Sequence, residues 1–283
     1  MPFFSVIIPS YNRAAILPRA IESILKQTFT DWELIIVDDG SIDATKELVS
    51  SYKDSRIHYV FQKNKGVCAA RNNGSTVSKG IFLCFLDSDD YVTEVWLSDF
   101  FSLNDKYYHL LFCNMKLIKL NQEVDLISIS NRNKEGKYFG KIPGSWIIRK
   151  EIFFDLGLFD ENIRFGENTE FFFRINKENL SYGFIDKYNF FYNESNDGGS
   201  KNLKNKIESN LYIIDKHPNY FKRHPNVLRL YYQNIAVAYS KLGMFEYSRK
   251  YFWLAYKVNI LKIDTLTRFG ISFFPILAKK KWK

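Results

Sequence analysis

The stretch IFLCFLDSDDYV, residues 81–92, places six apolar residues directly before three aspartates, Asp87, Asp89 and Asp90. An apolar run of this length is typical of a strand buried in a sheet. Carboxylates this close repel one another, so their position at a strand end needs a physical reason. Asp87 and Asp89 are two residues apart, and both can reach one hard cation that takes oxygen ligands. The alternative is a solvated acidic turn, because aspartate is common in turns.

Strands and helices alternate along the chain on either side of this stretch. Apolar, β-rich runs predict strands at 3–9, 32–39, 56–62 and 81–87, and helical spacing or end signals predict helices at 14–27, 44–52 and 66–80. Such alternation with short connections predicts an α/β fold, a Rossmann-like and mostly parallel sheet flanked by helices. Ligands bind such sheets beyond the carboxyl ends of the strands. The segment from Pro9 to Arg13, the pair Asp38 and Asp39, and the aspartates from residue 87 are therefore expected to meet in one crevice.

The rest of the chain divides into a less regular part and a helical part. Residues 107–120 predict a strand pair or meander, and helices are expected after Arg149 and within 167–180. Residues 227–259 have two amphipathic halves joined at Leu242 and Gly243, which predicts a helical hairpin. We therefore expect one domain over residues 1–198 and a basic, aromatic-rich helical extension over residues 199–283.

Composition narrows the class of protein. The four histidines are scattered and the three cysteines lack metal-ligand spacing, which argues against a zinc site or a histidine-based catalytic site. Three cysteines fit reduced thiols in a reducing compartment, so we expect a cytoplasmic location. No apolar run of about 18 residues occurs, so no membrane-spanning helix is expected. The net charge of +9 lies in the extension, where residues 199–283 carry 17 basic and 4 acidic side chains.

Four segments in series carry a family resemblance. The sequence SVIIPSYNR begins at residue 5, ELIIVDDGSIDAT at 33, NKGVCAARNNG at 64 and IFLCFLDSDDY at 81. In this order and at these intervals they resemble the nucleotide-sugar-binding half of family 2 glycosyltransferases of the GT-A fold. The resemblance covers about residues 3–198. It implies that the protein transfers a sugar, with inversion, from a nucleotide diphosphate sugar to a glycan or lipid-linked glycan acceptor. The resemblance also implies that the donor is a UDP-sugar and that the reaction belongs to surface polysaccharide biosynthesis.

The resemblance also implies roles for individual residues. Asp89 would bind Mn or Mg directly, with Asp87 and Ser88 acting on the ribose and on metal-bound water. The implied nucleotide-sugar-binding residues are Pro9, Tyr11, Arg13, Asp38, Asp39, Arg71, Asp87 and Ser88. Among them, Tyr11 is suited to stack on a uracil, Asp39 to accept a hydrogen bond from the base, and Arg71 to lie near the phosphates or the base. A divalent cation would stabilise the charge that builds up on the leaving diphosphate.

The sequence departs from the family at the general base. The family usually has Glu-Asp at the start of a helix, with the aspartate as base, whereas this chain has Glu167 and Asn168. An asparagine side chain is not a useful proton acceptor. Three interpretations stay open: Glu167 or Glu170 takes the proton, the position was replaced in order to trap substrate, or the protein is a weak or silent nucleotide-sugar-binding paralogue. Glu170 also has a structural interpretation, as a surface acid paired with Arg174.

Further alternatives concern the acidic motif, an aromatic residue and the tail. An apolar strand followed by Asp-x-Asp also occurs in phosphatases, but that reading leaves Asp38 and Asp39 unexplained. Trp146 is either a platform for the acceptor or a core residue. The tail, residues 264–283, mixes apolar residues with lysines, which suits a peripheral contact with an anionic membrane surface. Nothing in the sequence resembles a nucleic-acid recognition module.

Overall fold

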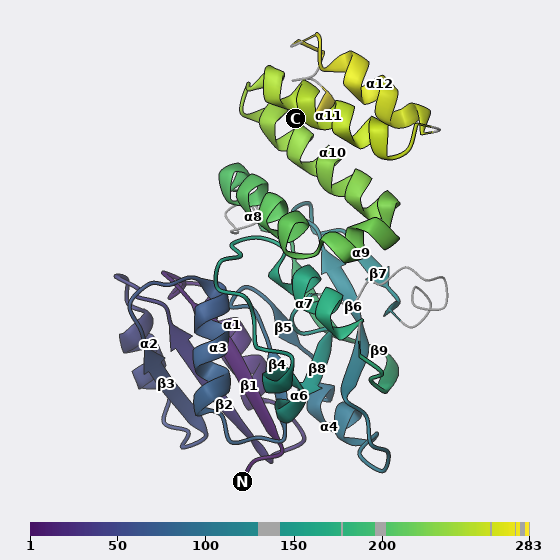
Figure 1. The fold of residues 1–283 in the computed structure, drawn as a ribbon. Helices are drawn as coiled ribbons and strands as arrows, with labels where there is room; N and C mark the ends of the chain where they lie inside the picture. Colours follow the sequence, from purple (N-terminus) through teal and green to yellow (C-terminus); the bar gives the residue numbers. More distant parts are fainter. Residues whose placement is uncertain are drawn as a thin grey trace. The chain divides into compact units, whose positions relative to one another are not determined.

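The computed structural model describes residues 1–129, 142–176, 178–195, 202–260, 262–274, 276–277 and 281–282. The chain forms two compact units (Figure 1). The first comprises Met1–Glu161 with Phe171–Ser195, and the second comprises Asn162–Glu170 with Asn196–Lys283. The domain boundary predicted at residue 198 lies outside the described residues and stays a prediction.

The first unit is built on one sheet. In the described part of the chain its nine strands are β1 (Phe4–Ser10), β2 (Trp32–Asp38), β3 (Ile57–Phe61), β4 (Phe82–Phe85), β5 (Tyr91–Val92), β6 (Leu110–Ile118), β7 (Val124–Ile127), β8 (Trp146–Arg149) and β9 (Tyr182–Asn193). The order across the sheet is β3-β2-β1-β4-β8-β6-β9-β5, with β7 paired to β6. Strands β3, β2, β1 and β4 are parallel, as predicted. Beyond β4 the sheet is mixed, because β8 runs antiparallel to both β4 and β6.

Helices cover both faces of this sheet (Figure 1). They are α1 (Leu17–Leu25), α2 (Thr45–Ser51), α3 (Val67–Val77), α4 (Trp96–Phe101), α6 (Lys150–Asp155) and α7 (Glu167–Ile175). Successive residues of one strand face opposite sides, so Ile8 packs into a core with α1 and α4 while Ile7 packs into another with α3 and α6. Strands buried on both faces explain the continuous apolar runs in the sequence. The predicted α/β class with a C-terminal helical extension is confirmed.

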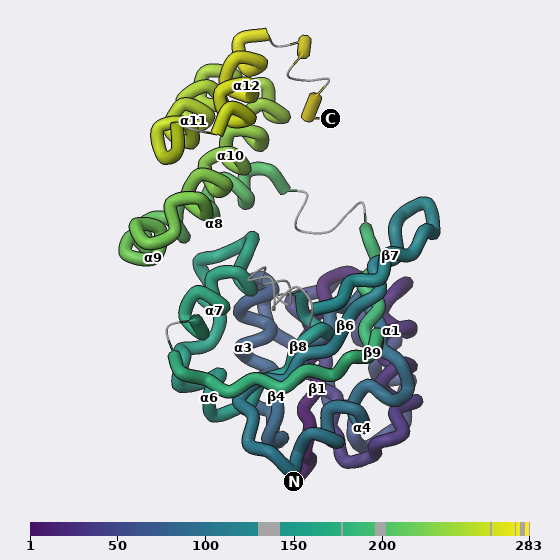
Figure 2. Tube along the Cα trace, turned by 90° about the vertical axis from the view of Figure 1, so that its right-hand side faces the viewer, coloured from purple at the N-terminus to yellow at the C-terminus, as the bar shows by residue number. Residues whose placement is uncertain are grey.

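The irregular middle of the chain differs from expectation in detail. Residues 107–120 contain one long strand, β6, rather than a strand pair, and its hairpin partner β7 follows it. Strands β8 and β9 were not predicted from the sequence. Strand β9 is the longest, with 12 residues, and it runs parallel to β6 with register shifts on either side of Asn114 (Figure 2).

The second unit is helical over its described residues. It contains α8 (Leu203–Lys216), α9 (Pro218–Arg223), α10 (Pro225–Lys241), α11 (Phe245–Val258) and α12 (Ile263–Ile271). Helices α10 and α11 form the predicted hairpin, and the turn contains Gly243 with a φ of 77°, a conformation that favours glycine. In the described part of the chain we find no helix with the length and apolar character that crossing a membrane requires.

Candidate active site

The predicted crevice residues follow the carboxyl ends of neighbouring parallel strands, β1, β2 and β4. Strand register aligns Ser10 of β1 with Asp38 of β2 and Ile7 of β1 with Phe85 of β4. The residues that follow these strand ends, including Asp87, therefore project beyond the same edge, as the parallel arrangement requires. Pro9 and Ser88 are buried at this edge, whereas the side chain of Tyr11 is 48% exposed and open to a planar ligand.

Asp38 and Asp39 are both buried, and both hold loops in place. Asp38 accepts hydrogen bonds from the Ser41 amide (2.8 Å) and from the Tyr59 hydroxyl (2.6 Å). Asp39 accepts hydrogen bonds from the side chain of Gln62 at 2.7 Å and from two backbone amides, Lys65 and Gly66, at 2.8 Å each. An ionised carboxylate has about four acceptor sites. Asp39 therefore fixes the loop before α3 and keeps acceptor capacity for a ligand.

The loops after β1 and β2 are joined by reciprocal hydrogen bonds. The Asn12 amide donates to the Ser41 hydroxyl, and the Ile42 amide donates to Oδ1 of Asn12, each at 2.9 Å. Asn12 has a φ of 53°, which asparagine tolerates better than most residues. Asp43 accepts a hydrogen bond from the Ala14 amide at 3.0 Å. The rim that carries Tyr11 and Arg13 is therefore held from both sides before any ligand arrives.

Arg71 connects α3 to the acidic motif. Its Nη2 lies 2.6 Å from Oδ1 of Asp87, and the Arg71 side chain is 2% exposed against 29% for Asp87. The guanidinium carbon also lies 5.5 Å from the centre of the Phe159 ring. A buried guanidinium paired to one carboxylate offsets part of the negative charge that the neighbouring aspartates concentrate.

Asp90 is the most deeply buried acid of the motif. Its Oδ1 accepts a hydrogen bond from the Asn193 amide at 2.8 Å, and its Oδ2 has no hydrogen-bond partner among the described residues. Burial, together with the charges of Asp87 and Asp89, raises the pKa of Asp90 well above its usual range. Burial and the same acids raise the pKa of Tyr192 to about 12. Burial is the largest cause of both shifts, and the neighbouring carboxylates add to it.

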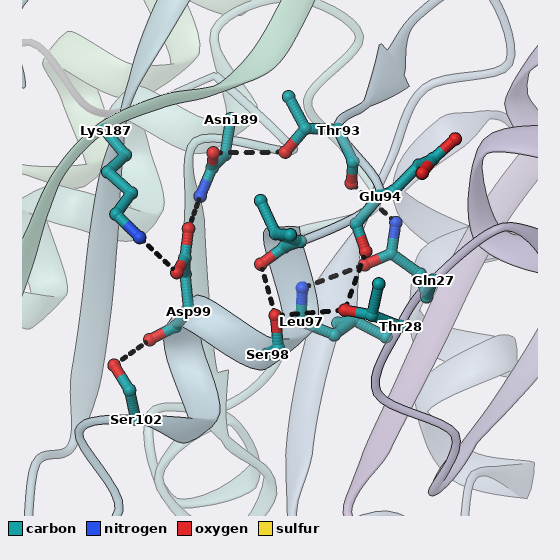
Figure 3. Close-up of polar contacts among 11 residues, drawn as sticks. Gln27, Thr28, Thr93, Glu94, Leu97, Ser98, Asp99, Ser102, Lys187 and Asn189 are labelled. Atoms are coloured by element: carbon teal, nitrogen blue, oxygen red, sulfur yellow. Dashed lines mark hydrogen bonds and ion pairs between the residues drawn. The ribbon is translucent and has the colours of Figure 1, made fainter.

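A polar network fixes the segment that follows the acidic motif (Figure 3). The side-chain amide of Gln27 donates to the Thr93 carbonyl at 2.7 Å and accepts from the Leu97 amide at 2.9 Å. The Thr93 hydroxyl donates to Asn189 of β9 at 3.0 Å, and Asn189 in turn donates to Asp99 at 2.8 Å. The chain leaving the aspartates is thereby held between α1, α4 and β9.

The predicted base region belongs to the second unit, because residues 162–170 group with the C-terminal helices. Glu167 is partly exposed, and its Oε1 accepts a hydrogen bond from the side chain of Asn168 at 2.8 Å. Glu170 is fully buried, and its Oε1 lies 2.9 Å from both Lys216 Nζ and His217 Nε2. The alternative of a surface Glu170 is wrong because the residue is fully buried. The Arg174 guanidinium donates to the carbonyls of Leu156 and Leu158.

The structure adds residues that sequence reasoning missed and corrects one alternative. Trp146 is fully buried and packs on Phe85 and Phe171, so it is a core residue and not an exposed platform.

Asn193 and Tyr59 bind the strand-end acids, yet they lie far from them in sequence and carry no local signal. Asn12 and Ser41 lie in segments that the sequence already marks as strand ends. Their polar side chains were the signal that could have indicated the hydrogen bonds between these two loops.

Comparison with known proteins identifies the family. Residues 5–157 match Glycosyl transferase family 2. An uncharacterized glycosyltransferase of Rickettsia felis is 37% identical over 194 residues, 65% of this chain and 31% of the relative. A UDP-Glc:alpha-D-GlcNAc-diphosphoundecaprenol beta-1,3-glucosyltransferase of Escherichia coli is 36% identical over 135 residues, 47% of this chain and 49% of the relative.

The similarity extends to solved structures. The crystal structure of S. aureus TarS 1–349 in complex with UDP-GlcNAc aligns with a TM-score of 0.66 at 17% identity, covering 99% of this chain and 89% of that one. At this identity the alignment shows a shared fold. The match to the Rickettsia felis relative spans about a third of that protein's length. The family match covers more than half of the present chain, which therefore belongs to family 2 of the glycosyl transferases.

Proposed function

We propose that this protein transfers a sugar from a UDP-sugar to a hydroxyl of a glycan or lipid-linked glycan, with inversion and with a divalent cation, in the biosynthesis of a surface polysaccharide. The observation that carries the proposal is that α3 connects two strand ends: Asp39, after β2, binds the Gly66 amide at the start of α3, and Arg71 of α3 pairs with Asp87, after β4. The Escherichia coli relative, named as a UDP-Glc-dependent glucosyltransferase, supports the donor and acceptor classes. Cys68, Cys84 and Cys113 are buried and outside any disulfide, which supports a cytoplasmic location.

The geometry of the strand ends supports a placement for the donor. We assign the nucleoside to the rim formed by Pro9, Tyr11 and Arg13, where the exposed Tyr11 ring offers a stacking surface. Asp39 keeps one acceptor position for the base imide while its other positions hold the loop before α3. Asp38 shapes the same rim through the Ser41 amide. We place Arg71 near the diphosphate, since a guanidinium suits phosphate oxygens.

The acidic motif fits a cation such as Mn or Mg. Burial and the charges of Asp87 and Asp89 raise the pKa of Asp90, and its Oδ2 has no hydrogen-bond partner among the described residues; both observations support a cation beside these carboxylates. Within the described ranges, no three His, Cys, Asp or Glu side chains gather as a complete metal cage. Magnesium is commonly bound by one or two carboxylates plus substrate phosphates. We propose Asp89 as the direct ligand, with Asp87 and Ser88 acting around it; the bound cation supplies Lewis-acid stabilisation of the leaving diphosphate.

We propose Glu167 as the general base. Its carboxylate is partly exposed, and the Asn168 amide donates to it and so orients it. Glu170 is the weaker choice, because it is buried and already engaged by Lys216 and His217. The second candidate function, a silent nucleotide-sugar-binding paralogue, rests on Asn168 itself. The buried Oδ1 of Asn168 has no hydrogen-bond partner among the described residues, so nothing there compensates for the missing carboxylate.

The test follows nucleotide release from a panel of UDP-sugars with Mn and glycan acceptors. We expect release by the wild-type protein, a drop of about 100-fold or more in Glu167→Gln, typical of losing a general base, and little change in the control Glu178→Gln. Tight binding without release, combined with release gained in Asn168→Asp, supports the silent paralogue and contradicts Glu167 as base. No binding of any nucleotide sugar contradicts both functions.

A further inference from the structure

Helix α12 packs Phe269 and Ile271 against a core cluster of the second unit, but it leaves other apolar residues exposed. Thr265 and Ser272 are fully buried, whereas the side chains of Ile263 and Leu266 are 74% and 41% exposed. At 3.6 residues per turn, Ile263 and Leu266 share one stripe with Gly270, and Thr265 and Ser272 share another. An ordinary surface helix turns its apolar residues toward the core and leaves no second apolar stripe in solvent. The exposed stripe is therefore unusual and needs an explanation.

Polar contacts with α10 fix this orientation. The Thr265 hydroxyl accepts hydrogen bonds from Arg229 Nη1 at 2.9 Å and from Gln233 Nε2 at 2.8 Å. Arg229 Nη1 also lies 3.3 Å from the carboxylate of Asp264. Turning the helix to bury Ile263 would break these buried hydrogen bonds, each of which is costly to leave unmade. The apolar stripe consequently stays outward.

The exposed surface continues beyond the helix and onto α11. Phe273 and Phe274 are 53% and 60% exposed. Phe269 lies 5.1 Å from Phe273 and 5.4 Å from Trp253, whose side chain is 41% exposed. Helices α11 and α12 lie side by side in both views of the chain (Figures 1 and 2). We call Trp253, Ile263, Leu266, Phe273 and Phe274 the C-terminal apolar face.

Basic side chains border this face. The Arg249 guanidinium lies 5.3 Å from the centre of the Phe273 ring, and the Lys257 ammonium lies 5.4 Å from the centre of the Trp253 ring. Residues 245–283 carry nine basic and two acidic side chains, a net charge of +7. One of the two acids, Asp264, pairs with Arg229. A second copy of the chain would bring the same positive charge against this surface, which disfavours self-association through it.

We propose that the C-terminal apolar face docks onto an anionic lipid bilayer. Apolar and aromatic side chains enter the boundary between headgroups and acyl chains, while the lysines and arginines around them contact anionic headgroups. The cationic border makes the lipid surface the occupant that matches both properties of the face. The docking goes beyond the proposed transfer reaction and does not depend on it, but it would keep the enzyme beside a lipid-linked acceptor.

Co-sedimentation of the full chain with vesicles tests the docking. We expect binding to vesicles of phosphatidylcholine with phosphatidylglycerol, much weaker binding to phosphatidylcholine alone, and loss of binding at high salt. The double variant Ile263→Ser/Phe274→Ser should lower the partition coefficient about 10-fold or more, because buried apolar groups contribute much of the binding. The matched control is Leu126→Ser, an equally exposed apolar residue of β7 (61%). Unchanged circular dichroism melting confirms that the variants are folded.

Two results would overturn the docking. One is a wild-type protein that fails to sediment with anionic vesicles, or a double variant that sediments as well as the wild type. The other is a wild-type dimer in sedimentation velocity that does not bind vesicles and that the double variant converts to a monomer, which would make the face a contact between copies. Nucleotide release without lipid, measured on the same preparations, reports on the proposed reaction alone.

Discussion

The backbone amide of Asn193 lies 2.8 Å from Oδ1 of Asp90, although the two residues are 103 positions apart in the chain. The Asn193 side chain also donates to the Asp89 carbonyl at 2.9 Å. Arg19 of α1 donates to that same carbonyl at 2.5 Å. The backbone of Asp89, the proposed cation ligand, is therefore held by Arg19 and Asn193, which both lie outside the acidic motif in the sequence.

We expect Asn193→Ala to weaken binding of UDP with Mn several-fold. The substitution removes the side-chain hydrogen bond to Asp89 but keeps the amide bond to Asp90, so the loss should be about 1 kcal/mol in binding and a similar amount in unfolding. Titration calorimetry measures the first and chemical denaturation the second. Asn121→Ala, in the exposed turn before β7, is the control. Equal weakening in both variants would mean that Asn193 has no special role.

Arg71 and Asp87 should be strongly coupled. Removing the buried guanidinium in Arg71→Ala leaves Asp87 beside two other acids, so we expect a loss of about 2–4 kcal/mol in the free energy of unfolding, reduced by the partial exposure of Asp87. The double variant Arg71→Ala/Asp87→Asn should recover part of this loss. Denaturant melts of the full cycle measure the coupling. Lys119→Ala, from an exposed ion pair, should change little; additive effects of Arg71 and Asp87 would contradict the coupling.

The hydrogen bond between Tyr59 and Asp38 predicts a pH dependence at alkaline pH. Burial and the Asp38 carboxylate raise the pKa of Tyr59. Above about pH 10 the unfolded chain loses the tyrosine proton while the folded chain keeps it, so this stabilisation is present below pH 10 and is lost as the pH rises further. Tyr59→Phe should cost about 1–3 kcal/mol at pH 7, because a buried carboxylate oxygen loses its donor. It should also show a shallower loss of stability above pH 10 than the wild type; parallel curves would exclude this linkage.

Two glycines should respond oppositely to alanine. A Cβ on Gly80 would lie 2.5–2.8 Å from atoms of Ser5 and the Phe4 backbone, so Gly80→Ala must shift β1 and should clearly destabilise the first unit. A Cβ on Gly270 meets nothing within 4 Å, and this residue is within α12. Gly270→Ala should therefore raise stability by about 0.5–1 kcal/mol. Thermal melts of the two variants make the comparison, and a Gly80→Ala protein as stable as the wild type would contradict the close approach.

The first 90 residues could be predicted because their signals are local. The apolar runs of β1, β2 and β4 are buried on both faces of the sheet, whereas edge strand β3 is only partly buried. Each helix between the runs has its own spacing and end signals. The residues at strand ends, such as Asp39 and Asp87, followed from topology alone. The order of these strands, with β3 at one edge and β4 next to β1, was not predicted and comes from the structure.

The middle of the chain was not predictable because its signals are not local. Strand β9 alternates irregularly between buried and exposed residues and shifts register beside Asn114, so its period is broken. Its partners β5 and β6 lie far away in sequence. Asp90 likewise accepts a hydrogen bond from Asn193, and Glu170 pairs with His217, which lies between α8 and α9 and 47 residues later in the chain. Nothing near these residues in the sequence indicates such contacts.

The late position of β9 bears on how the protein matures during synthesis. The family match ends at residue 157, when every aspartate of the motif is already in the chain. Strand β5, directly after the motif, pairs with Phe190 and Phe191. A nascent chain must therefore extend past residue 193 before the aspartates gain their last hydrogen bonds. Asp90, which is synthesised 103 residues before Asn193, thus belongs to one of the last parts of this unit to be completed on the ribosome.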